Sequence, residues 1–99
     1  MEGRSTIASE ILASYAADAA REVDGVGGLV ESSLHRHKGV RMLDDDGRLR
    51  VELHVNVEWG ASITDVGREV QQRVAGYLAQ MASIEPEAVD VIVDEIGPR

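Results

Sequence analysis

An alternating segment at residues 47–60 constrains the fold of this chain more than any other feature. Apolar side chains occupy every second position, namely Leu49, Val51, Leu53, Val55, Val57 and Trp59. The residues between them are polar, namely Arg48, Arg50, Glu52, His54, Asn56 and Glu58. Because successive side chains of a strand point to opposite faces, this pattern predicts a long strand with one apolar and one polar face. We therefore expect a sheet that is covered by helices on one side and open to partners on the other.

Two segments with helical periodicity can supply that cover. Residues 6 to 23 are rich in alanine, and their apolar positions recur at spacings of three and four. Thr6 is expected to cap this helix, and Asp24-Gly25 to end it, because glycine adopts the left-handed conformation that follows many helices. The small alanine side chains would let a second helix approach closely.

The second helix is predicted to begin after Ser62, with Asp65 three residues later in a near-capping box. Its apolar face follows as Val66, Val70, Val74, Leu78 and Met81. Gly67 and Gly76 lie inside this helix, where glycine costs about 1 kcal/mol relative to alanine. We therefore expect the two glycines to mark close packing, for example against the alanine-rich helix.

The remaining segments predict further strands. A short strand is expected from Leu29 to Leu34, and a hairpin whose turn lies in residues 43–47. The last strand contains Val89, Val91 and Val93. The fold class is α+β, a two-layer arrangement of a small, mostly antiparallel sheet with two helices on one face. The order is α-β-β-β-α-β, or α-β-β-α-β without the short strand, in a single domain of residues 1–99 with 1–5 and 97–99 frayed.

Composition narrows the classes of function. The chain has 18 acidic and 10 basic residues and a net charge of −8, so binding to nucleic acid or to an anionic bilayer is disfavoured. It has no cysteine, which excludes disulfides and thiolate metal sites. The N-terminal residues lack the apolar core of a signal peptide, and no apolar run approaches the roughly 20 residues of a membrane helix. We expect a cytoplasmic protein that reaches the membrane, if at all, through a partner.

Two clusters could in principle bind ligands. The run Asp44-Asp45-Asp46-Gly47 lacks the alternating spacing of a calcium loop and is better explained as turn chemistry. The cluster His35, Arg36, His37 and Lys38 is the one basic run in an acidic chain. It could contact an anionic ligand or nucleic acid, it could bind zinc together with His54, or it could be a solvated loop.

No recognisable catalytic motif is present, so we expect no enzymatic activity, no catalytic residue, no metal and no cofactor. The polar face of the long strand is instead the candidate interaction surface, formed by Arg50, Glu52, His54, Asn56 and Glu58. Such a face can bind a protein partner or a second copy of the chain, although solvated polar faces are also common in antiparallel sheets.

Several segments in this order resemble one known family. They are the alanine-rich helix led by Ile7 to Ile11, the turn at residues 22–26, and the strand at residues 51–60. Further along the chain they are Ile63-Thr-Asp-Val66, Val70-Gln71 with Val74, Met81, and Val89-Asp-Val-Ile-Val93. Together they resemble the alkaline shock protein family, the envelope stress response proteins of Gram-positive and related bacteria. Three positions depart from the family pattern: Trp59 replaces a tyrosine, Ser83 replaces a glycine, and Asp90 replaces an asparagine.

This resemblance implies a non-enzymatic cytoplasmic protein linked to stress response and cell-envelope homeostasis. Members of the family resemble abundant scaffolds, some of them held beneath the membrane by a small membrane-anchored protein. A homo-oligomer is expected on the same grounds. The alternative function is a small binding module that uses the His35–Lys38 cluster for an anionic ligand or nucleic acid.

Overall fold

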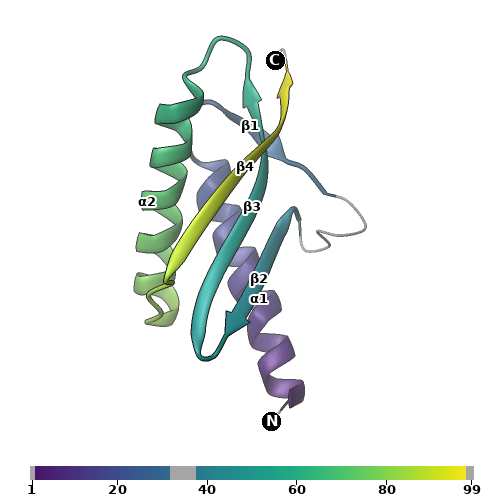
Figure 1. Cartoon of the computed structure of the whole chain (residues 1–99), viewed down its shortest axis with the longest axis vertical. Coiled ribbons are helices and arrows are strands. Elements are labelled where there is room, and N and C mark those ends of the chain that lie inside the picture. Colours follow the sequence, from purple (N-terminus) through teal and green to yellow (C-terminus); the bar gives the residue numbers. More distant parts are fainter. Residues whose placement is uncertain (1, 32–37, 98–99) are drawn as a thin grey trace.

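The computed structural model describes residues 2–31 and 38–97, in which two helices and four strands follow the order α-β-β-β-α-β. The elements are α1 (Glu2–Arg21), β1 (Val26–Leu29), β2 (Val40–Asp45), β3 (Arg48–Glu58), α2 (Ile63–Ala82) and β4 (Ala88–Gly97). The sheet forms one layer and the two helices form the other (Figure 1). The predicted α+β class and the fuller of the two predicted orders are therefore confirmed.

The long strand β3 is the centre of the sheet. β4 runs parallel to it along residues 50–58, and therefore occupies one whole edge of β3. The antiparallel strands β1 and β2 share the other edge, β2 along residues 48–53 and β1 along residues 55–57. Two of the three pairings are thus antiparallel, and β4 forms the border of the sheet on its own side (Figure 1).

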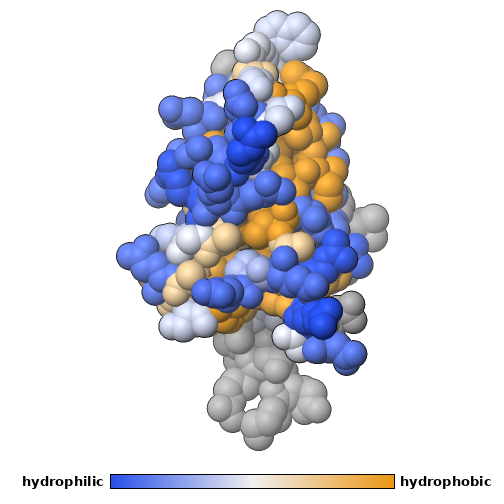
Figure 2. Space-filling model, turned by 60° about the vertical axis from the view of Figure 1, so that its left-hand side comes forward, coloured by the Kyte–Doolittle hydropathy of each residue, from blue (hydrophilic) through white to orange (hydrophobic). Residues whose placement is uncertain are grey.

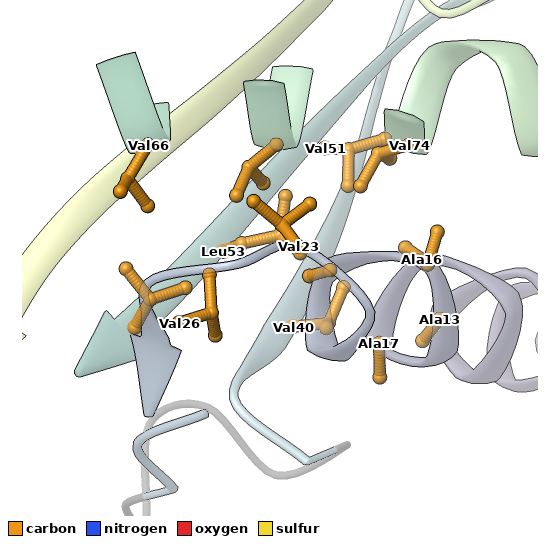
Figure 3. Packing of buried hydrophobic residues seen from close by; sticks show 14 of the residues in the cluster. Ala13, Ala16, Ala17, Val23, Val26, Val40, Val51, Leu53, Val66 and Val74 are labelled. Atoms are coloured by element: carbon orange, nitrogen blue, oxygen red, sulfur yellow. The ribbon is translucent and has the colours of Figure 1, made fainter. Parts of the chain in front are cut away.

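The apolar face of β3 is the floor of the core. Val51, Leu53, Val55 and Val57 have no solvent exposure, as the alternating pattern predicts. The helices cover them with different side chains: α1 contributes the small residues Ala13, Ala16, Ala17 and Ala20, and α2 contributes the larger Val70, Val74 and Leu78. Figure 3 shows labelled side chains from both helices and from the sheet in this shared interior. Because its buried side chains are mostly alanine, α1 packs closely against both α2 and the sheet.

The first helix differs from its predicted bounds. It begins at Glu2, so Thr6 lies within the helix and the predicted cap is wrong. Residues 2–5 contain no proline, and the helix extends through them. It ends at Arg21, and Gly25 then adopts a φ of 97° in the turn that leads to β1. The left-handed conformation predicted for Gly25 is confirmed.

The second helix confirms its predicted start and corrects the interpretation of its glycines. The Ser62 hydroxyl accepts a hydrogen bond from the backbone N–H of Asp65 at 3.2 Å. A methyl group added at Gly67 or Gly76 would meet no atom within 4 Å, so neither glycine marks a close helix contact. The close approach between the helices comes instead from the alanines of α1. At one point Tyr15 and Tyr77 pack edge to face with their ring centres 5.8 Å apart.

The predicted hairpin is confirmed, while the short first strand lies earlier than expected. Asp46 and Gly47, with φ of 59° and 81°, form the turn between β2 and β3. β1 covers Val26–Leu29, whereas residues 32–34 of the predicted strand lie outside the described residues. Gly27 and Gly28 are typical of a loop that connects two elements, but the segment is a strand, in which Val26 pairs with Val57 of β3.

Candidate functional site

The five residues of the predicted interaction surface all project from the polar face of β3. Residues from the neighbouring strand β4 complete this surface, notably Asp90, Asp94 and Glu95, which contact Arg50, His54 and Asn56 respectively. We call the whole set the polar sheet face. Its members are Arg50, Glu52, His54, Asn56 and Glu58 of β3 together with Asp90, Asp94 and Glu95 of β4.

His54 lies at the centre of this face and is only 7% exposed. Its Nε2 atom lies 2.7 Å from Glu52 Oε2, and its Nδ1 atom lies 2.8 Å from Asp94 Oδ2. Each ring nitrogen of His54 is therefore within hydrogen-bond distance of a carboxylate oxygen. His54 therefore connects two acidic side chains on adjacent strands, and it is buried within the face that was predicted to be the interaction surface.

Asn56 is the second constrained residue. Its Nδ2 donates a hydrogen bond to Glu95 Oε1 at 3.1 Å, whereas its buried Oδ1 has no hydrogen-bond partner within the described part of the chain. A methyl group on Gly27 of β1 would lie 2.6 Å from Oδ1, and one on Gly97 of β4 would lie 2.9 Å from Nδ2. The amide of Asn56 thus fills a slot that exists because both neighbouring strands carry glycine there.

Charge is distributed unevenly along the polar sheet face. Near the hairpin end, the Arg50 guanidinium lies 2.8 Å from Asp90, and Arg48 lies 3.6 Å from Glu87. Toward the other end the carboxylates are Glu58, Asp94 and Glu95. Within that group, Asp94 Oδ2 lies 2.8 Å from the Nδ1 atom of His54. One end of the face is therefore nearly balanced, and the other is acidic.

Sequence reasoning did not anticipate the contribution of β4. The register between β3 and β4 shifts after Val55, so that Val55 pairs with Val93 and Asn56 pairs with Glu95. Asp94 is the extra residue of this irregularity, and both it and Glu95 reach polar side chains of β3. In the sequence, the shift is indicated only weakly, by the two consecutive polar residues Asp94 and Glu95 that interrupt the alternation of Val89, Val91 and Val93.

Of the other candidate residues, the structure describes Lys38 and the acidic turn. His35, Arg36 and His37 lie outside the described residues, and Lys38 is exposed with a φ of 60°. Asp44 accepts a hydrogen bond from the Gly47 N–H at 3.1 Å, as expected for turn chemistry. Among the side chains that the structure describes, no group of three or more acidic or histidine residues is placed to hold a metal ion. No described helix is long and apolar enough to cross a membrane.

The polar sheet face carries charged and hydrogen-bonding groups that contact one another. Its carboxylates, guanidinium and imidazole are engaged with one another across two strands, as the short contacts of His54 and Arg50 show. Such a face can recognise charged or hydrogen-bonding groups of another protein, and the adjacent edge of the sheet can accept a further strand.

Comparison with known proteins places the chain in one family. Residues 1–98 match the alkaline shock protein 23 family, which is described as having a cell envelope-related function. The uncharacterized protein YqhY of Bacillus subtilis (strain 168) is 32% identical over 100 aligned positions, which cover 90% of this chain and 73% of YqhY.

Solved structures share the fold at low sequence identity. A zinc form of the MamM CTD is 15% identical with a TM-score of 0.58, over 90% of this chain and 87% of that chain. A manganese form is 16% identical with a TM-score of 0.57, over 88% of this chain and 98% of that chain. These likenesses concern the fold.

Proposed function

The chain belongs to the alkaline shock protein 23 family, and from this premise we propose that it is a non-enzymatic interaction protein of the cell envelope. It acts in the cytoplasm next to the membrane, through a protein partner that is itself membrane-anchored, and it self-associates as a scaffold. The observation that carries this proposal is the family match over residues 1–98, with its cell envelope-related function.

The surface of the molecule supports action through a protein. A net charge of −8 repels an anionic bilayer, so a partner is a better route to the membrane than direct contact with lipid. The polar sheet face and the border strand β4 offer charged groups and an extended backbone, which are the means by which sheets bind proteins. Non-enzymatic action agrees with the mutual pairing of the polar side chains on this face.

The test is crosslinking in the native host, followed by separation of membrane and soluble fractions and identification of bound protein and nucleic acid. The proposal predicts recovery in the membrane fraction with an integral membrane protein, and loss of that recovery when the gene for the integral protein is deleted. Recovery in the soluble fraction with RNA or a small anion would contradict it, and would favour the binding-module alternative instead.

The contribution of the polar sheet face is tested separately. Substitution of Glu52, His54 and Asn56 should weaken the crosslinked contact or the self-association. If every contact and the oligomeric state survive these substitutions in a folded variant, the polar sheet face is not the interaction surface.

A further inference from the structure

The border strand β4 presents a backbone edge on the side away from β3. Within the described residues its ladder partner is β3, and no strand pairs with its other edge. At the lower end, Gln71 Nε2 of α2 donates a hydrogen bond to the Val89 carbonyl at 3.0 Å. The part from Asp90 to Gly97 lies beyond that contact, and an unpaired strand edge of this kind can accept an added strand.

Apolar side chains gather on the helix side of this edge. Val91 and Val93 are partly buried, and Ile96 beyond them is 49% exposed. Ile63 at the start of α2 is 45% exposed, and Trp59 at the end of β3 is 76% exposed. Figure 2 shows apolar surface gathered in the upper part of the molecule, beside the hydrophilic surface. An added strand could bury apolar side chains here.

Acidic side chains gather on the opposite side of the same edge. Asp94 and Glu95 project from β4 onto the polar sheet face, with Glu58 of β3 at the same end of the sheet. A strand paired with this part of β4 would place every second side chain next to those carboxylates. Basic residues at these positions would be favoured, and acidic residues would be repelled.

We propose that the upper edge of β4, from Asp90 to Gly97, binds an extended segment of a partner protein as an additional strand. The segment alternates basic residues, which face Glu58, Asp94 and Glu95, with apolar residues, which pack beside Ile96 and Trp59. Protein segments next to a membrane helix on the cytoplasmic side are enriched in lysine and arginine, so they fit this chemistry. The choice of a basic segment next to a membrane helix rests on the proposed function, in which the partner is a membrane-anchored protein.

A second copy of the chain is a poorer occupant of the same edge. Two β4 strands side by side would bring together Asp90, Asp94 and Glu95 from both copies, and like charges on paired strands are destabilising. Self-association is therefore expected to use another surface.

The test is titration of the isotopically labelled protein with a soluble peptide that alternates lysine and valine over the 10-residue length of β4. The proposal predicts saturable binding, amide shift changes centred on residues 90–97, and slower amide exchange in the same stretch. A peptide with glutamate in place of lysine, and one with the same composition arranged in two blocks, should bind at least about tenfold more weakly.

Matched variants separate local from overall charge. The triple variant Glu58→Gln, Asp94→Asn, Glu95→Gln should weaken binding about tenfold, because rim charge pairs contribute modestly and add. The control Asp24→Asn, Glu69→Gln, Glu85→Gln removes the same charge from exposed positions elsewhere and should leave binding unchanged. A single variant, Ile96→Lys, gives an independent probe if the triple variant is poorly folded, and it should also weaken binding.

Three results would overturn the proposal. They are equal weakening by both triple variants, shift changes that lie outside β4 and its neighbours, and equal binding of the lysine and glutamate peptides. Because this experiment uses purified protein, its failure alongside a successful membrane crosslink would reject the β4 edge and leave the envelope function standing. Peptide binding at β4 without membrane recovery in the host would reject the envelope function and leave the β4 edge standing as a binding site.

Discussion

The slot around Asn56 gives a quantitative prediction for Gly27→Ala. The new methyl group would lie 2.6 Å from Asn56 Oδ1, well inside contact distance. The amide cannot simply swing away, because Gly97 bounds it on the other side, where an added methyl would lie 2.9 Å from Nδ2. The asparagine must shift and strain its 3.1 Å hydrogen bond to Glu95.

The expected cost follows from these contacts. Overpacking of a well-packed site costs about 1–3 kcal/mol, and the moving part here is a side-chain end, so we expect about 1.5 kcal/mol. Asn56→Ala removes the obstacle together with a buried acceptor that lacks a partner, so this substitution alone should be nearly neutral. In the Asn56→Ala background, Gly27→Ala should cost less than about 0.5 kcal/mol, which is a coupling of roughly 1 kcal/mol.

The assay is equilibrium unfolding in urea for the four proteins of this double-mutant cycle. Gly76→Ala serves as the matched control, because its added methyl meets no atom and its effect should be independent of Asn56. If Gly27→Ala costs the same with and without Asn56, the slot does not exist and the account of the polar sheet face loses its geometric basis.

Three further predictions concern stability and are checked by the same unfolding assay. Gly76→Ala in an exposed part of α2 should stabilise the fold by about 1 kcal/mol, and no gain would mean that the glycine has a packing role after all. Ser83→Gly should stabilise it by about 0.5–1 kcal/mol, because Ser83 caps α2 with a left-handed φ of 56°; a loss would show that its side chain matters there. His54→Ala should destabilise it by about 2 kcal/mol, because the buried ring and its contacts with Glu52 and Asp94 are lost. Arg68→Ala at an exposed pair should change it by less than about 0.5 kcal/mol, and equal effects of the two substitutions would contradict a structural role for His54.

Local periodicity predicted most of the fold. The two-residue alternation of β3 correctly assigned Val51, Leu53, Val55 and Val57 to the buried face. The assignment works because alternate side chains of a strand share one face, so covering that face buries all of them. The Ser62 cap and the turn at Asp46-Gly47 were predictable because their chemistry depends on neighbouring residues alone.

Features that depend on tertiary contacts were less predictable. The role of Gly27 depends on Asn56, which lies far from it in sequence, so the residues next to Gly27 do not reveal it. The prediction that Gly76 marks a close helix contact was wrong, because an added methyl group at Gly76 would meet no neighbouring atom. Of the candidate site, the five β3 residues were predicted, but the burial of His54 required Asp94 on a shifted strand, and no periodicity shows that shift.

The measurement that tests the central claim most directly is the position of the protein in living cells of its native host. The protein should be labelled at the native locus and imaged with the wild-type surface and with the Glu58→Gln, Asp94→Asn, Glu95→Gln variant. We expect a peripheral signal along the envelope for the wild type, and a signal that disperses through the cell for the variant. A wild-type signal spread evenly through the cell would contradict action at the envelope.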